Sequence, residues 1–216
     1  QGNITINAGE EFTFFINNIS TADLAKLSVN DLISFESNFG SALLLPDTRI
    51  TEIDADKIKN VISVNFFGVV DCVKTVENFY KKRKSGHISI VSSIAGYRGL
   101  PNSSGYGPSK AALTNFSESI YFDFKKYKVR VSLISPGFIK TPLTDKNDFS
   151  MPFLKSTTFA AEKIFIGLVN SNSFEIHFPK QLTLILKFLR ILPYRIYFFL
   201  VDKLVRRWAV LFYNLV

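Results

Sequence analysis

The chain has 216 residues, of which 47% are hydrophobic, so it can bury the core of one domain and is not a disordered chain. Its net charge is +8, and residues 181–216 hold six basic side chains against Asp202, or +5 of that total. No zinc-ligand spacing or RNA-binding aromatic motif accompanies this charge, which favours a membrane surface over nucleic acid. The single cysteine, Cys72, excludes an internal disulfide and indicates the reducing cytoplasm.

The first part of the chain predicts two strands, at 11–20 and 30–40, with a short helix at 21–27 between them. The clearest helix is predicted at 52–84, because apolar residues recur there at helical spacing and its last turn is basic. We expect Gly86, just beyond this helix, to provide a left-handed cap.

Strands and helices alternate through the remaining part of the core. The pattern predicts strands at 87–93, 129–135 and 173–178, and helices at 104–126 and 158–170. Such alternation indicates an α/β fold, a doubly wound parallel sheet of the Rossmann-like type with helices on both faces.

The segment "SSIAGYRGLPNSSGYGPSK", residues 92–110, combines residue types that suit proton transfer. Tyr106 and Lys110 are four residues apart on a predicted helix and therefore share a face. A free tyrosine phenol has a pKa of about 10, and a nearby ammonium lowers that pKa. Ser93, at the carboxyl end of a strand, can donate a hydrogen bond to the same substrate oxygen. We therefore predict acid–base chemistry on an alcohol or a ketone.

Two further features converge on the same place. The segment "SPGFIKT", residues 135–141, forms a second polar turn at a strand's carboxyl end, where ligands of open α/β sheets bind. Asn65 lies within the apolar stripe of the 52–84 helix, where its amide needs partners. It could hold a water or a helix backbone beside Lys110. Each feature alone also suits an ordinary turn, helix surface or core amide, but order and spacing favour one site.

Residues 58–141 resemble the short-chain dehydrogenase/reductase family through "VNFFGVV", "ISIVSSIAG", "YGPSK" and "PGFIKT". The resemblance implies NAD or NADP as cofactor and Tyr106 as the acid/base. It implies that Ser93 orients the substrate oxygen, that Lys110 lowers the tyrosine pKa and binds the nicotinamide ribose, and that Asn65 supports a proton relay. Further cofactor contacts implied by the resemblance are Pro136, Gly137, Ile139 and Thr141.

The N-terminal part departs from the family pattern. None of the eleven glycines forms the family's TGxxxGxG loop, so we expect an N-terminally incomplete fold. The chain starts with Gln and its one methionine is Met151, which suits a fragment or a processed product. Two segments resemble the family's NNAG turn, "SNFG" at 37–40 and "INAG" at 6–9. We favour "SNFG", because Asn38 lies 27 residues before Asn65, a normal distance in the family, whereas Asn7 lies 58 residues before Asn65. Asn38 and Gly40 would then contact the cofactor, and Asn18 would cap the adenine.

We divide the chain into a dehydrogenase core, 1–178, and a basic, apolar helical tail, 179–216. Pro193 interrupts the tail, and from Tyr194 onward an amphipathic helix is predicted with its charges in one arc. This pattern is typical of a helix lying on an anionic membrane, with a lid or a homodimer arm as alternatives.

Two functions follow from these features. The first is an NAD(P)-dependent oxidoreductase that interconverts a small secondary alcohol and a ketone, with an apolar or lipid-derived substrate. The second is a non-enzymatic protein of the same fold that acts as a membrane-associated interaction module.

Overall fold

The structure is a computed structural model that describes residues 53–141, 144 and 151–213, with side chains described as far as Leu204. The elements predicted before residue 50 lie outside the described residues. So do the expected incomplete N-terminus and the cofactor contacts proposed for Asn18, Asn38 and Gly40.

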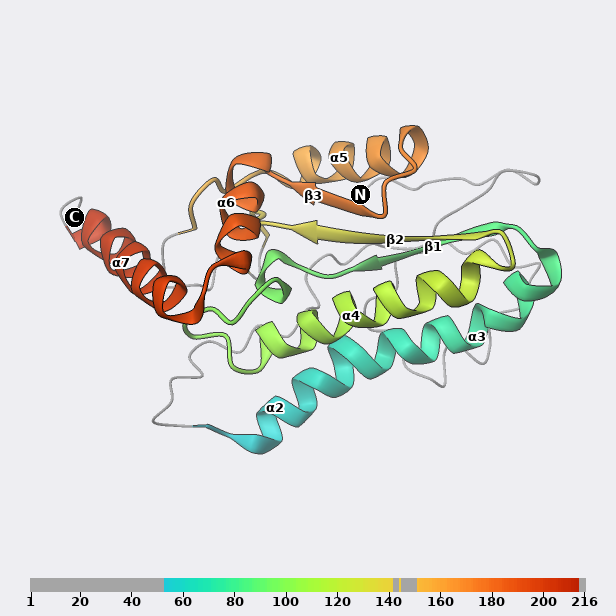
Figure 1. Cartoon of the computed structure of the whole chain (residues 1–216), viewed down its shortest axis with the longest axis horizontal. Helices are drawn as coiled ribbons and strands as arrows, with labels where there is room; N and C mark the ends of the chain where they lie inside the picture. Colours follow the sequence, from blue (N-terminus) through green and yellow to red (C-terminus); the bar gives the residue numbers. More distant parts are fainter. Residues whose placement is uncertain (1–52, 142–143, 145–150, 214–216) are drawn as a thin grey trace.

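Within the described residues the sheet has three parallel strands, in the order β1 (Gly86–Val91), β2 (Val129–Pro136) and β3 (Glu175–Phe178). Ile88 pairs with Val131 and Ile134 pairs with Ile176. The predicted parallel sheet is confirmed. Because the strands are parallel, their carboxyl ends meet at one edge, toward which the arrowheads of β1 and β2 point in Figure 1.

Helices cover both faces of this sheet. α3 (Gly68–Arg83) and α4 (Tyr106–Lys125) lie on one face, and α5 (Thr157–Asn170) lies on the other (Figure 1). Successive strand residues point to opposite faces, so Val131 packs on α3 and α4 whereas Ile134 packs on α5. Two apolar cores therefore hold the sheet from both sides, and the predicted doubly wound architecture is confirmed.

The predicted helix at 52–84 is helical from α2 (Ala55–Ile62) through α3, but a π-helical turn, Ser63–Phe67, separates the two. The prediction of a glycine cap was wrong. Lys84, with a φ of 54°, adopts the left-handed conformation and its N–H bonds the Tyr80 carbonyl. Gly86 instead begins β1 with a φ of 139°, and a Cβ there would collide with the Tyr80 ring.

The tail forms two helices, α6 (Lys180–Ile191) and α7 (Tyr194–Tyr213). The proline divides them because it cannot continue a helix hydrogen-bond ladder. Part of the apolar surface of α7 faces its own chain: Tyr197 and Val201 are buried against Leu189, whereas Phe198 and Phe199 of the same helix are exposed. The contact of this tail with a membrane, and the lid and homodimer arm that were its alternatives, stay predictions. Of the helices in the described ranges, none has the length and apolar composition of a membrane span.

Candidate active site

Ser93 lies in a turn directly after β1. Its hydroxyl accepts a hydrogen bond from the Ala95 N–H at 3.2 Å and so caps the 3₁₀ turn Ile94–Gly96. Its neighbour Ser92 donates to the carbonyl of Lys110 at 2.8 Å. The serine pair therefore has two roles: Ser92 fastens the turn to α4, and Ser93 is left at the carboxyl edge of the sheet.

Gly96 explains how closely this turn approaches α4. A Cβ at Gly96 would lie 2.7 Å from the carbonyl oxygen of Lys110 and 3.0 Å from the amide nitrogen of Ala111. Side chains do not approach backbone atoms so closely. A residue without a side chain is therefore needed for Ser93 to reach the first turns of α4.

Tyr106 and Lys110 lie on those first turns, as their spacing predicts. The Lys110 Nζ lies 5.6 Å from the centroid of the Tyr106 ring and 3.3 Å from the carbonyl oxygen of Val91. Lys110 is only 2% exposed, although it is the side chain expected to carry a charge. The strand end and the helix face thus bring Ser93, Tyr106 and Lys110 together.

Burial changes the acidity of both groups. It lowers the pKa of Lys110 from 10.5 to about 8, because a buried ammonium loses its hydration. Burial also raises the pKa of Tyr106 above its usual 10, while a side-chain hydrogen bond with Ser93 acts in the opposite direction. The lowering of the tyrosine pKa by Lys110 stays a prediction.

Asn65 lies in the π-helical turn and is 4% exposed. Its Nδ2 donates to the Ser109 hydroxyl at 3.1 Å, and that hydroxyl donates to the Tyr106 carbonyl at 2.7 Å. The sequence predicts either a water or a helix backbone as the hydrogen-bond partner of the Asn65 amide. In the structure the amide reaches the α4 backbone through Ser109. It therefore holds the first turn of α4, where Tyr106 begins.

The predicted cofactor turn after β2 is anchored at both ends. Gly137 donates its N–H to the Phe178 carbonyl at 2.7 Å, which ties the turn after Pro136 to β3. Thr144 donates to the Ile139 carbonyl at 2.7 Å and accepts from the Thr141 N–H at 2.8 Å. The turn thus lies at the same sheet edge as Ser93, since β1 and β2 are paired and parallel.

Sequence reasoning missed three supporting residues: Ser92, Ser109 and Thr144. Ser109 lies one residue before Lys110 and Ser92 one before Ser93, so both lie within the quoted motif, but a small hydroxyl in a helix or turn gives no signal of its partner. Thr144 follows Thr141 by three residues, a spacing that suits a local hydroxyl–backbone turn.

The comparison with known families agrees with this geometry. The family profile of the short chain dehydrogenases matches residues 37–150, which is more than half of the chain. The chain therefore belongs to the short-chain dehydrogenase family.

Several known proteins share parts of this chain. An uncharacterized oxidoreductase of Myxococcus xanthus is 37% identical over 146 residues, 68% of this chain and 57% of that protein. Human retinol dehydrogenase 8 is 34% identical over 110 residues, 51% of this chain and 34% of that protein. A short chain dehydrogenase from Burkholderia cenocepacia, solved with NADP, superposes with a TM-score of 0.61 at 22% identity, over 71% of this chain and 62% of that one. The chain thus spans between about a third and three fifths of the lengths of these proteins.

Proposed function

We propose that this protein is an NAD(P)-dependent oxidoreductase that interconverts a secondary alcohol and a ketone. One observation carries the proposal: Ser93, Tyr106 and a buried Lys110 converge at the carboxyl edge of a parallel sheet. Membership of the short-chain dehydrogenase family supports it. The same residues on an isolated helix surface would be hydrated, and burial is what gives them unusual acidity.

The residues present fit a nicotinamide cofactor. In the part of the chain that the structure describes, the Lys110 Nζ meets one hydrogen-bond acceptor, the Val91 carbonyl at 3.3 Å. An ammonium has three hydrogens, so ribose hydroxyls suit its remaining donors. Gly137, Ile139 and Thr141 belong to the anchored turn at the same edge and would hold the nicotinamide side, with Pro136 at its start. When bound, the cofactor supplies or accepts a hydride.

The chain's own residues handle the proton. In ketone reduction, the Tyr106 hydroxyl gives its proton to the carbonyl oxygen as the carbonyl carbon receives the hydride. In alcohol oxidation, the Tyr106 phenolate takes the hydroxyl proton as the hydride leaves. Ser93 hydrogen-bonds the substrate oxygen, Lys110 favours the phenolate, and Asn65 keeps the first turn of α4 in place through Ser109.

We include an apolar, lipid-derived substrate in the proposal, together with peripheral membrane contact through residues 181–216. Segments 101–105 and 143–154 flank the site in sequence and would line the substrate pocket; residues 143 and 145–150 of the second segment lie outside the described residues. The similarity to a protein named as a retinol dehydrogenase agrees with an apolar substrate, as does the apolar composition of the tail.

The test is oxidation of NADH or NADPH by the protein with a panel of ketones that range from hydrophilic to long-chain aliphatic. Turnover should be detectable, and Tyr106→Phe should abolish it with little loss of cofactor binding, because only the proton-transferring hydroxyl is removed. Tyr121→Phe, a half-buried tyrosine later on α4, is the matched control. Normal turnover by Tyr106→Phe would reject the mechanism. Binding of cofactor without turnover of any ketone or alcohol would favour the interaction module.

A further inference from the structure

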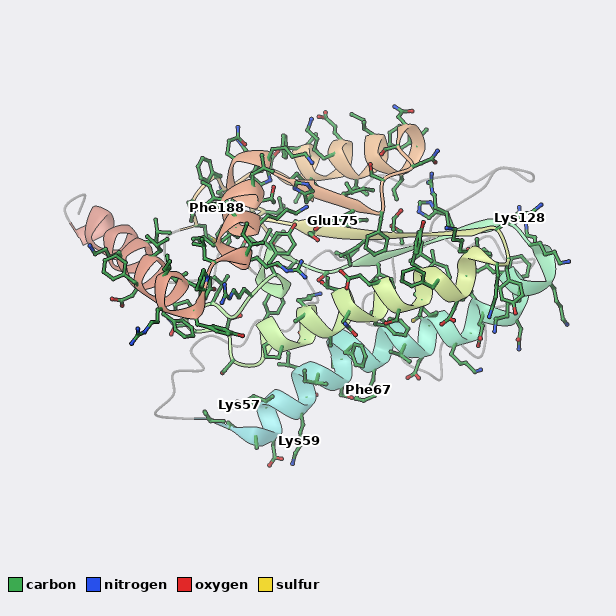
Figure 2. All side chains as sticks on the ribbon, in the orientation of Figure 1. Lys57, Lys59, Phe67, Lys128, Glu175 and Phe188 are labelled. Atoms are coloured by element: carbon green, nitrogen blue, oxygen red, sulfur yellow. The ribbon has the colours of Figure 1, made fainter. Side chains whose placement is uncertain are left out.

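The outward face of α6 is apolar where a surface helix is ordinarily polar. Leu184 is 57% exposed, Ile185 46%, Phe188 58% and Ile191 77%. They recur at the spacing i, i+1, i+4 and i+7, which places them on one side of the helix. In Figure 2, Phe188 lies on the α6 ribbon away from Glu175 of the sheet. We call these four residues the α6 stripe.

The inner face of α6 packs on the candidate active site. Leu182 is buried against Ile94, the residue after Ser93, and a Cβ on Gly137 would lie 3.2 Å from a Leu182 methyl. One helix therefore separates the two turns that form the site from the α6 stripe.

Three linkages fix α6 and α7 to the loop that runs from Ser93 to Tyr106, and one of them is a hydrogen bond that the Tyr197 hydroxyl donates to the Gly99 carbonyl. In the second, Glu175 of β3 accepts a 2.6 Å hydrogen bond from the Tyr97 hydroxyl and a 2.5 Å ion-pair contact from Lys187 of α6. Burial raises the pKa of Glu175, but the hydrogen bonds from Lys187 and Tyr97, the nearby Ser135 and the positive charge of Lys187 together keep that pKa below its ordinary value. The carboxylate is therefore charged at neutral pH, and α6 is held at a constant distance from the loop.

Arg98 makes the third linkage. Its guanidinium lies 2.9 Å from the carbonyl oxygen of Leu189 and 2.7 Å from that of Leu192, where α6 ends. It also stacks on the rings of Tyr194 and Tyr197, at 4.6 and 4.0 Å from their centroids. The guanidinium thus satisfies carbonyls that a helix end leaves without partners. The position of the α6 stripe relative to the site is set by these contacts.

The positive charge around the α6 stripe favours an anionic partner. Residues 180–204 contain five cations, Lys180, Lys187, Arg190, Arg195 and Lys203, against Asp202, a net charge of five minus one, or +4. Arg190 and Arg195 are exposed near the end of the stripe. Apolar side chains beside exposed cations match an anionic lipid surface, where the former enter the acyl boundary and the latter meet phosphates. α6 has 12 residues, or a length of about 18 Å, which suits a helix lying on a bilayer.

We propose that the α6 stripe docks the protein on anionic membranes, so that the Ser93 turn lies one helix away from the lipid. If the protein has the proposed function, docking through the α6 stripe also implies a substrate that comes from the membrane, and this implication rests on that function. The docking surface lies within residues 181–216, for which the sequence predicts membrane contact, and the proposal assigns that contact to α6, whose four exposed apolar side chains lie on one side of the helix.

The test is sedimentation of the protein with vesicles of phosphatidylcholine, alone or mixed with phosphatidylserine, at low and high salt. The protein should sediment with the mixed vesicles and less so at high salt, since salt screens surface charge. Ile185→Ser with Phe188→Ser should weaken sedimentation by about tenfold or more. The matched control is Phe122→Ser with Phe165→Ser, which alters two exposed phenylalanines on α4 and α5 (72% and 66% exposed) and should sediment as wild type.

A second pair of variants tests the charge. Arg190→Glu with Arg195→Glu should weaken sedimentation with the mixed vesicles by about tenfold or more, whereas Lys82→Glu with Lys163→Glu, exposed elsewhere, should not. Thermal unfolding should be alike for all four double variants and wild type. A wild-type protein that stays in the supernatant at low salt, or equal loss in the control variants, would overturn the proposal. A dimer that the Ile185 and Phe188 variant dissociates would instead assign the stripe to a second copy.

Vesicle sedimentation tests the docking surface and ketone turnover tests the proposed function, so one proposal can fail without the other. A protein that sediments but oxidises no NADH or NADPH would retain the docking surface and lose the proposed function. A protein that turns over ketones without sedimenting would retain the function and lose the docking surface.

Discussion

The Asn65 amide nitrogen lies 3.1 Å from the hydroxyl oxygen of Ser109, a residue 44 positions later in the chain. This contact joins the π-helical turn between α2 and α3 to the first turn of α4. π-Helical turns in proteins are rare and often lie at functional sites. Here the turn brings an amide to the one helix that carries both Tyr106 and Lys110.

The first prediction concerns this contact. Asn65→Ala and Ser109→Ala should each lower the free energy of unfolding by about 1–3 kcal/mol. The first removes the donor to the Ser109 hydroxyl, which keeps its bond to the Tyr106 carbonyl, and the second removes the acceptor of the buried Asn65 amide. The double variant should lose less than the sum of the two, with a coupling of about 1 kcal/mol. Chemical denaturation measures these values, and Asn115→Ala, exposed on α4, is the control. The pH profile of turnover should also shift in Asn65→Ala if the residue positions Tyr106. Strict additivity would contradict the contact.

Lys110→Met should be more stable than wild type at neutral pH while it impairs turnover and cofactor binding. Burial lowers the pKa of Lys110 from 10.5 to about 8, which corresponds to on the order of 3 kcal/mol against the charged form. That penalty is fully present below pH 8. Between pH 8 and about 10.5 the unfolded chain binds more protons than the folded one at this site, so wild-type stability from this group rises with pH.

The measurement is the difference in unfolding free energy between Lys110→Met and wild type at several pH values. The difference should be largest near pH 7 and shrink as the pH rises through 8 toward 10. Lys126→Met, an exposed lysine that follows α4, should show no such trend. A lower stability of Lys110→Met at pH 7 would show that the ammonium is stabilised rather than penalised in its site.

Gly96→Ala should damage both stability and activity, whereas Gly99→Ala should damage neither. A Cβ at position 96 meets the Lys110 and Ala111 backbone, and one at position 99 meets no atom within 4 Å. Moving a turn away from a helix to admit a methyl group costs about 1–3 kcal/mol. The same movement separates Ser93 from Tyr106, so turnover should fall by about tenfold or more. Melting temperatures and turnover of the two variants measure the contrast, and equal behaviour would rule out the close approach.

Arg98→Ala should loosen α6 and α7 from the protein. The variant loses the guanidinium at the end of α6 and its stacking on Tyr194 and Tyr197, and we expect a loss of about 2 kcal/mol. Arg98→Lys should restore little of the lost stability, because a lysine ammonium lacks the planar set of donors with which the guanidinium binds several carbonyls and stacks on the rings. Hydrogen exchange should become faster at the amides of α7 and near Leu192. Arg83→Ala, at an exposed arginine on α3, is the control. Unchanged exchange in Arg98→Ala would show that other contacts suffice.

The features that depend on short separations along the chain could be predicted from the sequence alone. Tyr106 and Lys110 share a helix face because they are four residues apart, and alternating apolar segments are enough to predict a parallel sheet with helices on both faces. The position of Ser93 at a strand end followed from the same pattern. These features arise from the geometry of single elements, which a local pattern specifies.

The partners of residues that are far apart in the chain became visible only in the folded protein. Asn65 reaches Ser109 across 44 residues and Arg98 reaches Leu192 across 94, and neither pairing has a spacing that a pattern could reveal. The orientation of the tail was decided in the same way. Its apolar residues suit a membrane, a lid or a second chain equally well, because hydrophobic burial has no direction. In the folded chain Tyr197 packs on Leu189, whereas the α6 stripe stays exposed.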